Sequence, residues 1–172
     1  MNFTNTQIHN EMMPSIDDVI LKPISKAYIK VIIVNSVIVY GIILSVLTAI
    51  KVFLKKEVIQ DNFWYLFVIV LVICAFNFVT ALLAFKKRQY AIREKDVIYA
   101  KGFIVHSVTT VPVSRIQHIE TSRSWLDRKL NLATLNIYTA GESGTDLSIK
   151  GLPNKEAKQV NDFLSSKVNE NN

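Results

Sequence analysis

The chain has 172 residues, of which 50% are hydrophobic and 20% are charged, and its formal net charge is +6. This length allows one domain of ordinary size, or a smaller domain attached to an anchoring segment. The single cysteine, Cys74, excludes an intrachain disulfide framework and a thiolate metal cluster.

The hydrophobic residues are concentrated in two uncharged stretches, 31–50 and 62–85. About 20 residues in a helix cross a hydrocarbon core of about 30 Å. Buried helices of a soluble protein rarely stay uncharged over such lengths, and the first stretch lacks the cleavage pattern of a signal peptide. The sequence therefore predicts two transmembrane helices, joined by the extracytoplasmic loop 51–61 and preceded by the segment 1–30.

Lysine and arginine residues near the ends of these spans predict the orientation. Nine lie on the side that carries both termini, and three lie in the connecting loop. Because basic residues are enriched on the cytoplasmic side, we expect both termini to be cytoplasmic. The segment 1–30 starts with an irregular stretch rich in Asn, Thr and Met and is expected to be partly disordered. Its part from Ile16 to Ile24 is a candidate for lying along the membrane interface.

Residues 86–172 differ in character from the spans, because short runs rich in valine, isoleucine and threonine alternate with turns. We expect strands at 90–92, 96–100, 102–111, 115–121, 135–138 and 146–150, with a hairpin loop at 140–145. After Asn154, apolar residues recur at helical spacing: Ala157, Val160, Phe163 or Leu164, and Val168. The pattern predicts a strongly bent antiparallel sheet, or partly open barrel, closed by a C-terminal helix.

A short helix is expected between two of these strands. Ser124 and Asp127 have the spacing of a capping box, and Arg123 and Asp127 have that of an i, i+4 ion pair. The helix is either a solvated structural turn or an interface, since tryptophan and arginine are typical of interface anchors. The residues of this candidate interaction surface are Arg123, Trp125, Arg128 and Lys129.

The order VPVSRIQHIETSRSWLDRKLNLATLNIYTAG, followed by SIKGLPNKEAKQVNDFL, resembles bacterial PH-like membrane proteins of the YdbS-like family. The matching positions are Pro112, Arg115 to Ile119, Arg128 with Asn131-Leu132-Ala133, Thr139-Ala140-Gly141, Gly151-Leu152-Pro153 and Glu156-Ala157. The family's usual glycine is Asn131 here, a residue that also adopts left-handed backbone.

This resemblance implies a two-helix transmembrane hairpin followed by a PH-like α+β domain over residues 86–172, in the bacterial cell membrane. The implied domain is a curved sheet of roughly seven strands capped by one helix, a fold that by itself implies neither an activity nor inositol-phosphate binding.

The residue inventory argues against an enzyme. The candidate bases are His9, His106 and His118, and His118 could pair with Glu120 or Asp127, but no third group completes a triad. GESG at 141–144 lacks the spacing of a nucleophile elbow, and no phosphate loop or paired-histidine metal motif is present in the sequence. We therefore expect a non-enzymatic protein with no metal, cofactor, small-molecule substrate or nucleic-acid partner.

Two functions remain. Residues 86–172 contain 14 basic and 9 acidic residues, and Lys86, Lys87 and Arg88 form a basic cluster next to the membrane. This cluster could serve a sensor of anionic lipid headgroups, but it is also the ordinary topology signal at the end of a span. The preferred hypothesis is an assembly module that binds another membrane protein or copies of itself at the inner surface of the membrane. The family association points to envelope maintenance or stress.

Overall fold

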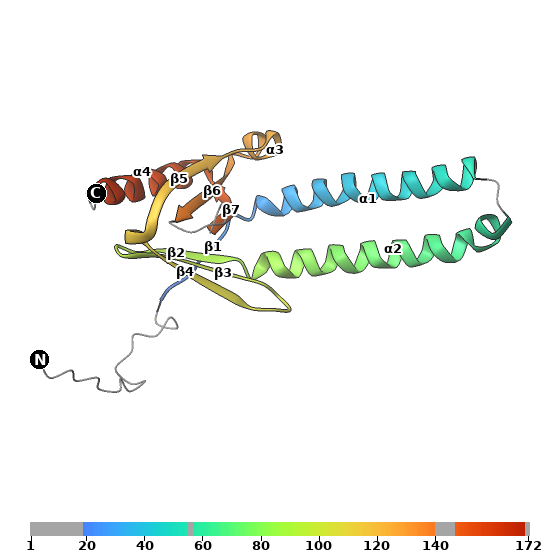
Figure 1. Cartoon of the computed structure of the whole chain (residues 1–172), viewed down its shortest axis with the longest axis horizontal. Coiled ribbons are helices and arrows are strands. Elements are labelled where there is room, and N and C mark those ends of the chain that lie inside the picture. Colours follow the sequence, from blue (N-terminus) through green and yellow to red (C-terminus); the bar gives the residue numbers. More distant parts are fainter. Residues whose placement is uncertain (1–18, 55–56, 140–146, 171–172) are drawn as a thin grey trace, which may run out of the picture.

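Two long helices project side by side from one end of a β-rich domain (Figure 1). The computed structural model describes residues 19–54, 57–139 and 147–170. The helices are α1 (Tyr28–Phe53) and α2 (Glu57–Lys86), and they run antiparallel. Between them, the hydroxyl of Tyr40 donates a hydrogen bond of 2.7 Å to Oδ1 of Asn77.

The apolar surfaces of both helices face outward. The stretches Tyr28–Phe53 and Gln60–Lys86 have mean hydropathies of 2.4 and 2.8, and only 6% and 0% of their most apolar windows are buried in the protein. A core helix of a soluble protein would be mostly buried, so these surfaces must face lipid. The predicted transmembrane hairpin is confirmed, with helices a few residues longer than 31–50 and 62–85.

The strands form two antiparallel sheets, one of four strands in the order β1-β2-β3-β4 and one of three in the order β5-β6-β7. Their bounds are Lys22–Pro23 (β1), Gln89–Ile92 (β2), Asp96–Lys101 (β3), Ser107–Pro112 (β4), Ile116–Ser122 (β5), Leu132–Thr139 (β6) and Leu147–Pro153 (β7). The 3-10 turn η3 (Val113–Arg115) joins the two sheets, and the short helix α3 (Trp125–Lys129) joins β5 to β6. This arrangement, with the C-terminal helix α4 (Asn154–Glu170), is the expected PH-like α+β architecture.

Three strand predictions need correction. The strand expected from residue 102 begins only at Ser107, because Gly102 has φ +105° and starts a tight turn. The strands expected at 135–138 and 146–150 extend further, to 132–139 and to 147–153. The expected hairpin loop at 140–145 and residues 16–18 lie outside the described residues.

The N-terminal segment contributes a strand that the sequence does not reveal. Lys22 pairs with Tyr90 and Pro23 with Gln89, and the next residue, Ile24, is only 4% exposed. This stretch therefore enters the domain instead of lying along the membrane interface. The hairpin of α1 and α2 is inserted between β1 and β2, so the domain is assembled from residues on both sides of its own membrane anchor.

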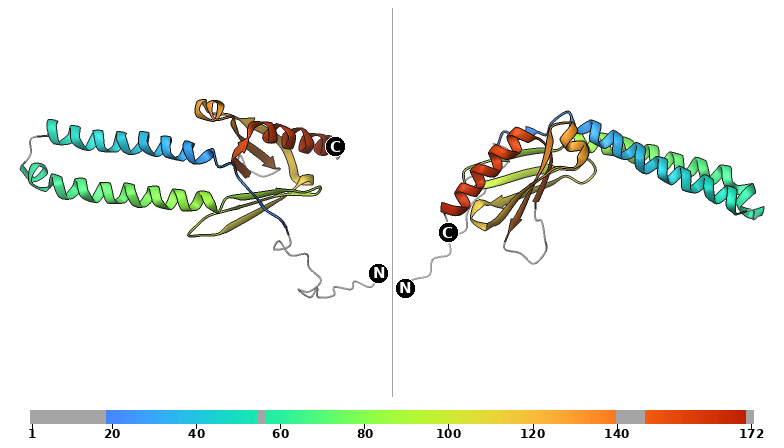
Figure 2. Two further views of the ribbon diagram at one scale, coloured as in Figure 1. Left: turned by 180° about the vertical axis from the view of Figure 1, so that it is seen from behind. Right: turned by 90° about the horizontal axis from the view of Figure 1, so that it is seen from above.

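The core lies between the two sheets and α4 (Figure 2). Leu135, Ile137 and Ile149 from the second sheet are fully buried there, as is Val97 from the first. On α4, Ala157 and Leu164 are 0% exposed. The amphipathic register expected from the sequence is confirmed, and it is Leu164, not Phe163, that enters the core.

Gly151 fastens the start of α1 to the second sheet. Its φ is +81°, and a Cβ atom there would lie 2.6 Å from Cγ of Tyr28. The amide of Ser25 also donates to the carbonyl of Gly151 at 2.9 Å. Only glycine satisfies both the left-handed backbone and this close approach.

We expect Gly151→Ala to destabilise the domain by about 1 to 3 kcal/mol, because the methyl group adds backbone strain and displaces Tyr28. Thermal unfolding of the detergent-solubilised full chain measures the change. The matched control is Gly41→Ala in α1, where a Cβ would meet no described atom within 4 Å. Equal stability of the two variants would contradict the proposed close fit.

Candidate functional site

The short helix α3 begins with the predicted capping box. Oγ of Ser124 accepts a hydrogen bond from the amide of Asp127 at 3.1 Å, and Oδ2 of Asp127 accepts one from the amide of Ser124 at 3.1 Å. The predicted left-handed residue is also confirmed, since Asn131 has φ 55°. The capping box fixes the start of α3, and the left-handed residue turns the chain from the end of α3 into β6.

The expected ion pair between Arg123 and Asp127 is wrong. Because Ser124 already occupies the Asp127 carboxylate, Arg123 turns away, and its Nε donates to the carbonyl oxygen of Leu132 at 2.9 Å. Its second contact is the carbonyl oxygen of Arg128 at 3.4 Å. Arg123 therefore stabilises the connection between α3 and β6 through hydrogen bonds to its backbone.

The outer side of α3 carries the exposed tryptophan. Leu126 is buried against Val31 and Leu132, which holds α3 beside the first turns of α1 (Figure 1). Trp125 on the outside is 55% exposed, and Nζ of Lys129 lies 5.0 Å from the centroid of its ring system. Of the four residues of the candidate interaction surface, Trp125, Arg128 and Lys129 are exposed together, and Arg123 is diverted to the backbone.

The basic cluster at the end of α2 also has both exposed members and a half-buried one. Lys86 and Lys87 are exposed, whereas Arg88 is half-buried and turned toward the domain. Its guanidinium carbon lies 5.7 Å from the ring centroid of Tyr28, and its carbonyl accepts from the amide of Ile24 at 3.3 Å. Arg88 thus belongs to the domain rather than to the exposed topology signal.

Arg88 opens onto a basic pocket at the base of the hairpin, with a volume of about 390 Å³. The described residues that line it are Tyr28, Arg88, Tyr99, Lys101, Thr109, Leu147, Ser148 and Lys150. They come from the start of α1, the connection between α2 and β2, and strands of both sheets. Three of these residues are cationic and none of them is a carboxylate.

The lining of this basic pocket suits an oxyanion. Arginine presents a planar fork of donors that matches phosphate, and each lysine adds a compact point charge. Burial raises the pKa of Tyr99, although the nearby charge of Arg88 acts in the opposite direction, so Tyr99 keeps its proton and remains a donor. Positive charge gathered in one concavity, with no carboxylate among the described lining residues, attracts anions. No local sequence pattern predicts this site, because Lys101 and Lys150 lie in different sheets.

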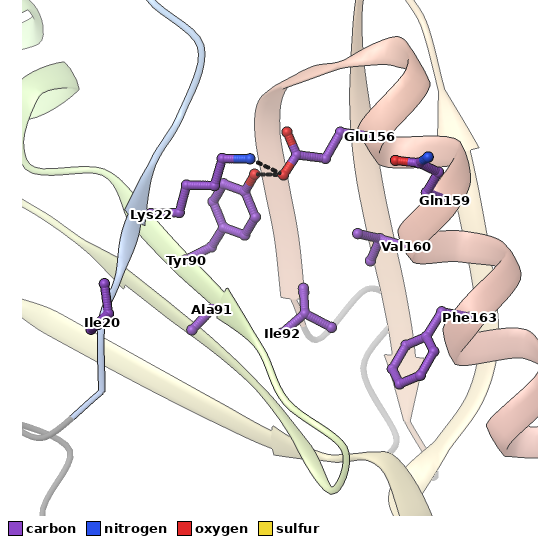
Figure 3. Close-up of a pocket in the computed structure, with 9 residues that line it drawn as sticks. All are labelled: Ile20, Lys22, Tyr90, Ala91, Ile92, Glu156, Gln159, Val160 and Phe163. Carbon is purple, nitrogen blue, oxygen red and sulfur yellow. Dashed lines mark hydrogen bonds and ion pairs between the residues drawn. The ribbon is translucent and has the colours of Figure 1, made fainter.

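A second pocket, between β1, β2 and α4, has an ion pair at one end of its lining (Figure 3). Nζ of Lys22 lies 2.6 Å from Oε1 of Glu156, and the hydroxyl of Tyr90 donates to the same oxygen. Burial alone would raise the pKa of Glu156, but the hydrogen bonds from Lys22 and Tyr90 hold it below its ordinary value. This cluster links the N-terminal strand to the C-terminal helix.

His118 makes neither of the pairings considered for it. Its ring lies 5.6 Å from that of Tyr138, whose hydroxyl donates to Glu120 at 3.0 Å. Asp127 is held by the capping box. The remaining histidine among the described residues, His106, lies in the turn between β3 and β4.

Comparison with known proteins gives one family and one curated relative. The bacterial PH domain family matches residues 27–168. The UPF0699 transmembrane protein YdbS of Bacillus subtilis (strain 168) is 36% identical over 77 residues, which are 45% of this chain and 46% of that protein. The match thus spans less than half the length of the relative. The comparison with solved structures found no match.

We expect Glu156→Gln to destabilise the protein at neutral pH by about 1 to 2 kcal/mol, since charge-assisted hydrogen bonds are lost. A carboxyl group with a lowered pKa stabilises the folded state above its ordinary pKa, and this contribution disappears as the pH falls through the lowered value. The difference in thermal unfolding between the two proteins should therefore shrink in acid. Asp162→Asn, on the exposed side of α4, is the control and should change little.

Proposed function

The chain belongs to the bacterial PH domain family, and we propose that its domain binds the anionic headgroups of the membrane in which it is anchored, through the basic pocket. One observation carries this proposal. Arg88, Lys101 and Lys150 converge on one cavity, and none of the described residues that line it is acidic.

The position of the pocket supports a lipid rather than a soluble anion. Tyr28 is the first residue of α1, and Arg88 follows the last residue of α2 by two positions. The pocket therefore lies where the two spans leave the bilayer, which is the level of the phosphate groups. A headgroup can reach it from the membrane surface without a movement of the domain.

The charge distribution fits the cytoplasmic leaflet, where the excess of basic residues beside the spans would place the domain. Anionic lipids there attract each nearby lysine or arginine by about 1 kcal/mol. Lys86 and Lys87 supply such attraction at an exposed surface. The pocket also holds its cations in fixed positions around one cavity, where they can bind a single headgroup. The proposal involves binding only and no catalytic step.

A second candidate is the assembly module expected from the sequence. It is favoured by Trp125, which is 55% exposed on a helix that is fixed to α1 by buried Leu126. A rigidly mounted, exposed tryptophan with Arg128 and Lys129 beside it is the composition of an interface anchor. A partner at this surface would also have to lie close to the membrane, either another membrane protein or a second copy of this chain.

Neutralising the basic pocket should abolish stabilisation by anionic lipid. In the detergent-solubilised full chain, short-chain phosphatidylglycerol at a hundred times its dissociation constant should stabilise the fold by about 2.7 kcal/mol, measured by thermal unfolding. Phosphatidylcholine should have little effect. The triple variant Arg88→Gln, Lys101→Gln, Lys150→Gln should lose the response to phosphatidylglycerol.

The matched control removes the same charge elsewhere, with Lys95→Gln, Lys155→Gln and Lys158→Gln at exposed positions. It should keep the response. Inorganic phosphate, tested alone, separates a lipid site from a site for free phosphate. An equal response of both triple variants to phosphatidylglycerol would refute the headgroup proposal.

For the assembly candidate, we expect Trp125→Ala to weaken binding of a membrane partner, or self-association, by about 2 kcal/mol or more. Native mass spectrometry of the protein extracted from its membrane, with and without a photo-crosslinker at position 125, measures this. Phe163→Ala, at a partly exposed position on α4, is the control. A monomer with no stoichiometric crosslinked partner would count against this candidate.

A further inference from the structure

The turn between β3 and β4 presents three consecutive apolar side chains at its tip. Phe103, Ile104 and Val105 are 47%, 77% and 77% exposed. Tips of tight turns are usually built from glycine, proline, asparagine, aspartate or serine. Three adjacent apolar residues at such a place are costly in water and indicate a surface that is covered.

The backbone of this turn has a defined shape. Gly102 has φ +105°, and a Cβ atom there would lie 1.8 Å from the carbonyl oxygen of Val105. Only glycine allows the chain to fold back so sharply. The glycine closes the base of the turn and leaves the apolar side chains on the outside.

The tip lies against the membrane-spanning part of α2. Figures 1 and 2 show the turn projecting past the sheet toward the hairpin. A groove of about 290 Å³ separates it from the helix, and its lining combines both elements: Asn77, Thr80, Ala81, Ala84, Gly102, Phe103, Ile104 and Val105. From Ala84 back to Asn77, this contact extends about 10 Å along the helix axis.

This position sets the depth of the turn in the membrane. The apolar part of α2, Gln60–Lys86, has 27 residues, a length of about 40 Å at 1.5 Å per residue. A hydrocarbon core of about 30 Å covers all but about 5 Å at each end of a centred helix. Asn77 and Ala81 are then inside the hydrocarbon, and Ala84 is near its boundary.

We propose that the β3–β4 turn is a non-spanning insertion into the same bilayer, with acyl chains covering Phe103, Ile104 and Val105. The β3–β4 turn lies beside α2 at Asn77 to Ala84, so the bilayer that surrounds this part of α2 also surrounds the turn. The groove between turn and helix is then filled by lipid tails.

The charges around the turn fit this occupant. From Val97 to Ile119 the sequence contains no aspartate or glutamate, so the part of the hairpin nearest the turn carries no charge that opposes an anionic leaflet. Asp96, at the other end of β3, forms an ion pair with Arg93. Lys101 lies at the base of the turn, where a lysine can keep its ammonium group among the headgroups while its stem contacts apolar surface.

The insertion would fix the orientation of the domain. The two spans hold it at one point, and the turn supplies a second contact on the α2 side of the hairpin. Because Lys101 lines the basic pocket as well, the inserted turn keeps that pocket facing the membrane surface. The insertion itself depends on apolar contact and does not require the headgroup proposal.

Depth-dependent fluorescence quenching tests the insertion in the full chain. On a Cys74→Ala background, Ile104→Cys is labelled with an environment-sensitive fluorophore and reconstituted into phosphatidylcholine nanodiscs. We expect blue-shifted emission, strong quenching by nitroxides on lipid acyl chains and weak quenching by iodide. Asp162→Cys on the exposed face of α4 should show the reverse.

Two results would overturn the proposal. Iodide quenching at 104 equal to that at 162 would place the turn in water. Protection from both quenchers would mean that protein, either a partner or a second copy, covers the tip. Val105→Cys repeats the measurement, and thermal unfolding confirms that each labelled variant is folded. Neutral lipid is used so that loss of headgroup binding cannot mimic failure of insertion.

Discussion

The pairing of β1 with β2 is the constraint on which the rest of the molecule depends. β1 precedes the first membrane helix and β2 follows the second, so the two strands fasten both ends of the hairpin into one sheet. Backbone hydrogen bonds from Ile24 to Arg88 and from Ser25 to Gly151 complete this junction. Among the described residues, no flexible linker separates the domain from its anchor, so the tilt of the helices and the orientation of the sheets are coupled.

Three features gather around this junction on the side of the domain that meets the membrane. The basic pocket lies at the base of the hairpin, the apolar β3–β4 turn lies beside α2, and α3 with Trp125 lies beside α1. Each suits one layer of a bilayer surface: cations for phosphates, aliphatic side chains for acyl chains, and an amphipathic tryptophan for the boundary between them. Together they support the proposal that the domain contacts the membrane surface directly.

The sequence predicted those features that arise from local patterns. Long uncharged stretches, the Ser124 to Asp127 spacing and the apolar period of the last helix each depend on neighbouring residues, and the structure confirms them. The α3 surface is only partly predictable. The Asp127 carboxylate accepts hydrogen bonds from Ser124 in the capping box, and Arg123 donates to the backbone instead.

Features that depend on distant residues could not be predicted. A two-residue strand such as β1 has no measurable period, and only the fold reveals its partner. Arg88 looked like one more member of an exposed basic cluster, and Lys101 and Lys150 were isolated charges on separate strands. Their convergence follows from how the two sheets meet, which no short window of sequence contains.

The split origin of the first sheet also has a consequence for biosynthesis. The ribosome releases β1 before either hydrophobic segment, yet its partner strand appears only after both have been made. The sheet can close only if insertion has returned the chain to its starting side. A polypeptide in which only one segment has inserted would have β1 and Ile24 on the opposite side of the bilayer from β2, with the core open to proteases. The first sheet can therefore form completely only in chains whose two segments have both been inserted.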